Sequence, residues 1–148
     1  RPPPDCIPTD TKAAGLYMIC TLSKHEAEKN GFTDALMLDY KGRVSESTGS
    51  NIFLVMNGEI HTPVPDCFLN GITRQAVIEI AKNEGMKVIE RDIYPDEIKN
   101  AEEIFLTGSA VEVTPVGKID NQTFKVGDIT AKISSLYMKE VDPNYNDN

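Results

Sequence analysis

The sequence predicts a single domain of the α/β class, and three observations lead to this prediction. Its 148 residues match the usual length of one domain, which buries roughly two thirds of the surface that its unfolded chain exposes. Short apolar runs bounded by turn residues alternate with segments in which apolar residues recur every three or four positions. Hairpins combined with strand–helix–strand connections are typical of a mixed α/β fold.

Three segments have the apolar spacing of an amphipathic helix. Residues 12–29 form the first and are followed by a glycine, a residue that commonly ends a helix. Its predicted inward positions are Leu16, Ile19, Cys20 and Ala27. The second helix is opened by residues 70–74 and ends near Gly85, and residues 128–141 form the third. A shorter helix is predicted to begin at Pro95, since proline suits the first helical turn.

The strands are predicted from apolar runs and the turns beside them. Residues 51–55 and 59–61 flank an Asn-Gly pair at 57–58, which favours a tight hairpin because both residues tolerate positive φ. Residues 35–38 are expected to enter another hairpin through the turn at 39–42. Further extended segments are predicted at 87–93, 103–106 and 111–116.

The charge and cysteine content exclude several classes of partner. A net charge of −8 and a pI of about 4.7 argue against nucleic acids and anionic membranes, because both require a positive surface. Three widely spaced cysteines form neither a disulfide framework nor a CxxC motif, so we expect a reduced, cytoplasmic protein. No apolar run reaches the roughly 20 residues of a membrane span. No metal site is expected, because His25 and His61 lack partners at metal-ligand spacing.

The first residues suggest a boundary between domains. The sequence begins with Arg1, followed by three prolines, and proline-rich segments are typical of extended linkers. We therefore interpret residues 1–11 as the end of an interdomain linker, 12–142 as the domain itself and 143–148 as a polar tail. On this interpretation, an N-terminal domain precedes the sequence.

Two candidate sites are single charged residues among small ones. Lys12 is surrounded by threonine, alanine and glycine, so that a planar ligand could approach its amine and desolvate it; the alternative is a solvated surface lysine. Glu46 is the one carboxylate in the hydroxyl-rich stretch 44–51, where hydrogen bonds could keep it ionised beside a cation. On its own, this stretch is interpreted as a polar loop with Glu46 facing water.

Two further segments could bind an anion. Residues 70–74 are Asn-Gly-Ile-Thr-Arg at a helix start, where free amides and a threonine hydroxyl favour a phosphate; ordinary capping is the alternative. Residues 107–110 are Thr-Gly-Ser-Ala after a strand, a turn that can direct successive amides at a phosphate or carboxylate. The alternative there is a plain β-turn.

Taken in order, the four segments resemble the motifs of class IV aminotransferases, the fold-type IV pyridoxal-phosphate enzymes. The resemblance covers almost the whole sequence and is closest to the larger, C-terminal pseudo-barrel domain of bacterial branched-chain amino-acid aminotransferases. The matching segments are 12–17 (the Schiff-base lysine), 45–53 (Ser-Glu-x-x-Gly-x-Asn-x-Phe), 69–74 (the Gly-Ile-Thr-Arg helix start) and 108–116 (Gly-[Ser/Thr]-Ala-x-Glu-[Val/Ile]-x-Pro-Val).

The resemblance implies a role for each matching residue. Lys12 is the Schiff-base lysine and the general base and acid. Glu46 pairs with the protonated pyridine nitrogen, so that the ring remains an electron sink, and Tyr17 hydrogen-bonds the phenolic oxygen. The other implied ligands of pyridoxal 5'-phosphate are Leu69, Gly71, Ile72, Thr73, Gly108 and Ser109. Ser109 and Ala110 are implied to bind the substrate.

The implied activity is the exchange of an amino group between leucine, isoleucine or valine and 2-oxoglutarate, a reaction of branched-chain amino-acid biosynthesis. A homodimer or higher homo-oligomer is also implied. D-amino-acid aminotransferase and aminodeoxychorismate lyase share the fold and are alternatives. A catalytically inactive fragment or binding domain is an alternative of another class, against which the presence of both Lys12 and Glu46 argues.

Two positions depart from the pattern of the family. Ser50 stands where many members have glutamate, and Asn70 stands where proline or a small residue is frequent. In addition, the phosphate-binding arginine of the family and much of its apolar substrate pocket belong to the smaller N-terminal domain. The resemblance therefore implies the chemistry more strongly than the substrate specificity.

Overall fold

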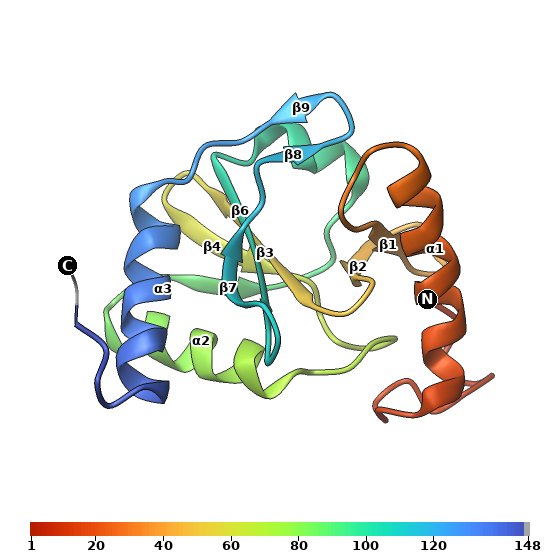
Figure 1. Ribbon diagram of the computed structural model, residues 1–148, viewed down its shortest axis with the longest axis horizontal. Coiled ribbons are helices and arrows are strands. Elements are labelled where there is room, and N and C mark those ends of the chain that lie inside the picture. The colour runs from red at the N-terminus through yellow and green to blue at the C-terminus, as the bar shows by residue number, and fades with distance from the viewer. Residues whose placement is uncertain (147–148) are drawn as a thin grey trace.

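A seven-stranded sheet with β3 at its centre organises the fold (Figure 1). In the computed structural model, which describes residues 1–146, the sheet is antiparallel except where β4 pairs with β5. Its strands are β1 (Leu36–Leu38), β2 (Val44–Ser47), β3 (Asn51–Met56), β4 (Glu59–Thr62), β5 (Val88–Glu90), β6 (Glu103–Gly108) and β7 (Glu112–Pro115). A small separate hairpin joins β8 (Lys118–Ile119) to β9 (Gln122–Thr123).

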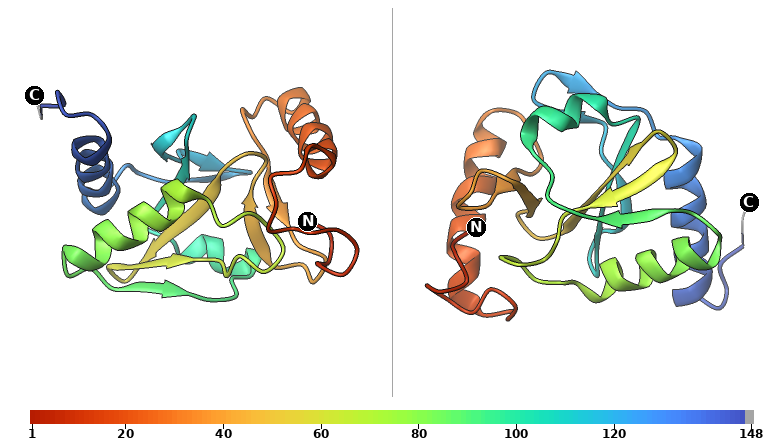
Figure 2. Two further views of the ribbon diagram at one scale, coloured as in Figure 1. Left: turned by 90° about the horizontal axis from the view of Figure 1, so that it is seen from below. Right: turned by 180° about the vertical axis from the view of Figure 1, so that it is seen from behind.

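The helices lie at two sides of this sheet. They are η1 (Ala14–Leu16), α1 (Tyr17–Lys29), α2 (Ile72–Asn83), η2 (Pro95–Asn100) and α3 (Asp128–Val141), where η marks a 3-10 helix. Helices α2 and α3 pack side by side at one end of the molecule, and α1 lies at the other (Figures 1 and 2). None of the helices within residues 1–146 has the length and apolar character needed to cross a membrane.

Strand β3 is buried on both faces, which explains its continuous apolar sequence. Successive side chains of a strand point to opposite faces, so Phe53 and Val55 enter one core while Ile52 and Leu54 enter the other. The first core lies between the sheet and helices α2 and α3, and the rings of Phe53 and Phe105 stack there with centroids 4.9 Å apart. The second core lies under η2. Because β3 is packed on both sides, its position and register are closely determined.

Several sequence predictions are confirmed. The fold is α/β, and helix α3 has the predicted bounds. The Asn57-Gly58 turn joins β3 to β4 with φ angles of 53° and 73°. Helix α2 starts directly after Gly71, and the segment that precedes it is a loop, as predicted.

Other predictions are wrong in part. The helix predicted at 12–29 begins only with η1 and α1, and its expected inward residue Ile19 is 38% exposed. The strand predicted at 87–93 is reduced to the three residues of β5. The stretch 44–51 is not a loop facing water: β2 occupies its first half, and Glu46 is buried. The hydroxyl side chains of β2 concealed the strand, because they lack the apolar alternation that marks one.

The proposed domain boundaries remain predictions. Residues 1–11 form turns that pack on the domain, with Thr9 buried and its hydroxyl donating to the Asp66 carbonyl. Of the predicted polar tail, residues 143–146 follow α3 as turn and coil, and residues 147–148 lie outside the described residues.

A buried arginine ties three loops together beside the sheet. The Arg43 guanidinium contacts Asp39 at 2.6 Å, Asp66 at 2.7 Å and Asp92 at 2.7 Å. Burial alone would raise the pKa of Asp39, but hydrogen bonds from Arg43 and from the Lys41 amide bring it below its ordinary value. The buried Asp39 carboxylate therefore depends on Arg43 for its charge.

We predict that Arg43→Met lowers the free energy of unfolding by about 3–5 kcal/mol, because it leaves the Asp39 carboxylate buried without a counter-charge. The matched control is Lys132→Met, which breaks an ion pair whose two side chains are 50% and 38% exposed and should cost no more than about 1 kcal/mol. Urea unfolding measures both. Equal losses in the two variants would contradict the role given to Arg43.

Candidate active site

A cavity of about 170 Å³ brings the four candidate segments together. Every residue that the family resemblance implies to bind the cofactor lines it: Lys12, Tyr17, Glu46, Leu69, Gly71, Ile72, Thr73, Gly108 and Ser109. Ala110, implied to bind the substrate, is not among the lining residues and lies in the exposed turn after β6. Segments that are up to about a hundred positions apart in sequence thus form one concave site.

The N-terminus of α2 supplies unpaired donors to this cavity. Gly71 is the N-cap residue with extended backbone and no side-chain capping bond, and the first helical hydrogen bond runs from the Gln75 amide to the Gly71 carbonyl. The amides of Ile72 and Thr73 therefore have no partner within the helix. Nearby, the hydroxyl of Thr107 is buried without a hydrogen-bond partner. Such a set of donors, together with the helix dipole, suits a phosphate or another anion.

Asn51 fixes the loop that leads into α2. Its side-chain amide donates to the Leu69 carbonyl at 3.0 Å, and its Oδ1 accepts the Gly71 amide at 3.1 Å. A Cβ added at Gly71 would lie 2.5 Å from Oδ1 of Asn51. Glycine is therefore required at position 71 by close approach and not by an unusual backbone angle.

Arg74 holds the same loop from the other side. Its guanidinium is fully buried and donates to Asn70 Oδ1, to the Pro63 carbonyl and to Glu90 Oε2 at 2.8–2.9 Å. The arginine of the Gly-Ile-Thr-Arg segment is thus structural, and Asn70 accepts one of its hydrogen bonds. This contact gives a physical reason for asparagine at position 70.

Glu46 is the buried carboxylate of the cavity. It lies on β2, paired with Met37 of β1 and Asn51 of β3. Burial raises the pKa of Glu46 to about 7, and the positive charge of Arg1, whose Nε is 3.0 Å from Oε1, acts in the opposite direction. Sequence reasoning assigned Arg1 to a linker and missed this contact, because the two residues are far apart in sequence.

Lys12 and Tyr17 reach the cavity from the start of the first helix. Lys12 lies just before η1, and Tyr17 is the first residue of α1. Across residues 1–146, no carboxylate forms an ion pair with the Lys12 amine. An amine in this position is available to react with a bound carbonyl compound.

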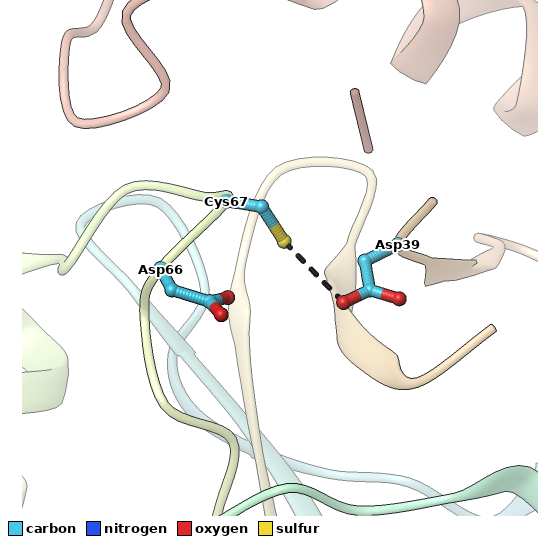
Figure 3. Close-up of side chains that lie close together, drawn as sticks. All are labelled: Asp39, Asp66 and Cys67. Carbon is cyan, nitrogen blue, oxygen red and sulfur yellow. Dashed lines mark hydrogen bonds between the residues drawn. The ribbon is translucent and has the colours of Figure 1, made fainter. Parts of the chain in front are cut away.

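The side chains of Asp39, Asp66 and Cys67 form a second cluster (Figure 3). None of the three residues lines the cavity. The ligand atoms of this cluster lie within 4.8 Å of one another, but the Arg43 guanidinium already contacts both carboxylates. Burial and the neighbouring carboxylates raise the pKa of the Cys67 thiol to about 12, so it is a poor thiolate ligand at neutral pH. Arg43 therefore supplies the positive charge that this cluster requires.

Fold and site together define a mixed α/β protein whose cavity combines an amine, a buried carboxylate and anion-binding amides. The model of the class IV amino-transferase family matches residues 1–119. The chain belongs to the class IV aminotransferase family.

Relatives of known sequence agree with this assignment. The chain is 42% identical over 137 residues to a probable branched-chain-amino-acid aminotransferase of Rickettsia felis, a match that covers 93% of this chain and 47% of that protein. It is 39% identical over 132 residues to the branched-chain-amino-acid aminotransferase of Pseudomonas aeruginosa, covering 87% of this chain and 43% of the relative. The chain therefore spans about half the length of these relatives.

The fold is closely similar to a solved structure. The crystal structure of an aminotransferase from Brucella abortus, bound to the cofactor PLP, matches with a TM-score of 0.91 and 38% identity. The match covers 95% of this chain and 50% of that one.

We predict that Gly71→Ala lowers the free energy of unfolding by about 1–3 kcal/mol, because the added methyl group displaces the buried Asn51 side chain. Gly15→Ala is the matched control, since no atom lies within 4 Å of a Cβ added there. Thermal unfolding compares the two. A Gly71→Ala variant as stable as Gly15→Ala would show that Asn51 is not held tightly.

We also predict a pH-dependent effect of Glu46→Gln on the stability of the cofactor-free protein. The folded protein keeps the Glu46 proton up to about pH 7, whereas the ordinary pKa is 4.5. The wild type therefore loses stability as the pH rises through this window. Glu46→Gln removes the loss, so its stability relative to the wild type should increase between pH 4.5 and 7, by at most about 3 kcal/mol.

The control for this measurement is Glu97→Gln, whose stability relative to the wild type should stay constant between pH 4.5 and 7 and should change with the opposite sign only below pH 4.5. A hydrogen bond from Arg91 lowers the pKa of Glu97, so the wild type gains stability from this group as the pH rises through the lowered pKa. Chemical denaturation at a series of pH values measures both variants. A difference for Glu46→Gln that does not change with pH would contradict the prediction.

Proposed function

We propose that this chain is the cofactor-bearing part of a pyridoxal-phosphate-dependent branched-chain amino-acid aminotransferase. The observation that carries the proposal is the single cavity lined by Lys12, Glu46 and the uncapped N-terminus of α2. An amine, a buried carboxylate and free backbone amides are the groups that the aldehyde, ring nitrogen and phosphate of this cofactor require. The names of the relatives support a branched-chain amino acid, that is leucine, isoleucine or valine, as the amino donor. We propose 2-oxoglutarate as the acceptor, as the family resemblance implies.

The residues present fit the cofactor. Three donors in the cavity wall are free to bind the oxygens of a phosphate: the amides of Ile72 and Thr73 and the hydroxyl of Thr107. Gly71 lets the α2 loop keep its close contact with Asn51, so these amides stay at the cavity wall. The Brucella abortus aminotransferase was solved with PLP bound, which supports the same ligand here.

Each of these residues has a distinct task in the proposed reaction. When bound, pyridoxal phosphate supplies an electron sink for the bond broken at the substrate α-carbon. Lys12 Nζ would remove the proton from that carbon of the amino donor and, in the second half of the reaction, would deliver a proton to the α-carbon of the amino acid formed from the 2-oxo acid. Glu46 holds a negative charge beside the ring nitrogen, and Tyr17 donates a hydrogen bond from its phenolic hydroxyl. Ser109, which lines the cavity, assists in binding anionic groups through its amide and hydroxyl.

The proposal extends to properties of the whole protein. We propose a homodimer or higher homo-oligomer in the cytoplasm, with small amino acids and 2-oxo acids as its ligands. The three cysteines are free thiols in the structure, which is compatible with a reducing compartment.

The experiment that tests the function is reductive labelling of the longest natural chain that contains this sequence. After addition of pyridoxal phosphate and reduction with borohydride, peptide mapping should find the label on Lys12. Lys12→Ala should lose the label, and the control Lys24→Ala, at an exposed position of α1, should retain it. A label that persists in Lys12→Ala would refute the proposed site.

The same preparation separates the alternative enzymes of the fold. L-Leucine and D-alanine are assayed as amino donors with 2-oxoglutarate. A higher turnover rate with L-leucine than with D-alanine supports the branched-chain assignment. Preference for D-alanine would replace it by a D-amino-acid aminotransferase.

A further inference from the structure

Arg1 is buried against the wall of the proposed cofactor cavity. Its side chain is 4% exposed and lines the cavity. Nη1 donates to the Leu16 carbonyl and to Cys20 Sγ, each at 3.1 Å, and the backbone nitrogen donates to the Leu38 carbonyl of β1. The guanidinium is thus held between the start of α1 and the sheet. Such anchoring fixes where its charge lies.

The Arg1 charge acts on Glu46. Nε of Arg1 lies 3.0 Å from Glu46 Oε1, and the Glu46 side chain is only 9% exposed. Within residues 1–146, the ion pair with Arg1 is the one polar contact that the Glu46 carboxylate makes. The contact is an ion pair and not a hydrogen bond, because the buried Nε of Arg1 has no hydrogen-bond acceptor among the described residues. Oε1 of Glu46 is therefore paired with the Arg1 charge, whereas Oε2 has no polar partner in this part of the chain. Glu46 lines the cavity.

We propose that Arg1 is a positioning residue that favours the carboxylate form of Glu46 and leaves its second oxygen for the ring nitrogen of the bound cofactor. The inference rests on the proposed function, because the ring nitrogen is the group that a carboxylate must face. The observed contact of the Arg1 guanidinium with a carboxylate of the cavity is the one with Glu46. Its effect on the reaction is transmitted through the ionisation state of Glu46.

The buried position of Glu46 calls for a nearby cation if its side chain is to ionise. Burial disfavours the charged form of Glu46, and Arg1 is the largest influence that favours it. The other titratable side chains around Glu46 are the Cys20 thiol of α1, and Lys12 and Tyr17 in the cavity. Cys20 is buried, which raises the pKa of its thiol and keeps it neutral. Arg1 is therefore the group whose removal should change Glu46 most.

The test is the titration of Glu46 in the cofactor-free protein, followed by carbon-13 NMR of its side-chain carboxyl. Arg1→Met is expected to raise the pKa of Glu46 by about 1–3 pH units, because an opposite charge within about 4–6 Å lowers a carboxyl pKa by this amount. The control Arg91→Met removes an arginine that pairs with Glu97 and does not line the cavity; it should leave the Glu46 titration unchanged. An unchanged Glu46 pKa in Arg1→Met would overturn the proposal.

Two further variants distinguish charge from packing. Arg1→Lys keeps a cation and should restore a Glu46 pKa close to that of the wild type. Arg1→Gln keeps a donor for the Leu16 carbonyl without the charge, so it should behave like Arg1→Met and can replace it if that variant does not fold. Equal titrations in Arg1→Lys and Arg1→Gln would assign Arg1 a purely structural role and refute the proposal.

The loaded enzyme gives an independent readout. In the longest natural chain, kcat of Arg1→Met should fall about tenfold for each pH unit by which the Glu46 pKa exceeds the assay pH, and Arg1→Lys should recover most of the loss. A kcat that is unaffected while the Glu46 pKa rises would overturn the link to the cofactor. Labelling of Lys12 tests the function separately, so failure of the one claim is distinguishable from failure of the other.

Discussion

The site depends first on Asn51, because this residue joins three segments that are distant in sequence. Its backbone pairs with Glu46 on β2 and with Thr107 on β6, while its side chain holds the loop that enters α2. The carboxylate, the orphaned hydroxyl and the free helix amides are thereby placed by one residue of the central strand. Since β3 is packed on both faces, a displacement at Asn51 would disturb both cores. The close packing of the two cores therefore also fixes the positions of the cavity residues that Asn51 contacts.

Buried arginines provide a second level of organisation around this centre. Arg74 holds the α2 loop, Arg43 joins loops beside the sheet, and Arg1 faces Glu46. A planar guanidinium can bind several acceptors at once, so each arginine connects segments that are distant in sequence. The burial of these charges is costly unless they are paired. This cost is offset by the hydrogen bonds and carboxylates that surround them, and it makes the loop geometry specific.

Helices, strands and turns could be predicted from the sequence where residues close together in the chain determine them. The bounds of α3 and the Asn57-Gly58 hairpin depend on spacing and turn residues that are adjacent in sequence, and both could be predicted. Strand β2 could not, because its hydroxyl residues are buried by neighbouring strands and not by their own apolar character. Ile19 was placed wrongly because the spacing of a helix does not reveal which side of α1 meets the sheet. The motifs identified the cavity residues, whereas the contact of Arg1 with Glu46 arises only from the folded chain.

The cavity also explains why a carboxylate with so high a pKa is compatible with the proposed chemistry. A Glu46 exposed to water would be ionised without help but would interact weakly with a ring nitrogen, because solvent screens the charge. Burial strengthens that interaction and at the same time favours the neutral acid. A fixed cation beside Glu46 resolves the conflict, since it favours the carboxylate without occupying the oxygen that must face the cofactor. The same argument applies to the α2 amides, which are left unpaired by the protein and gain a partner only when an anion binds.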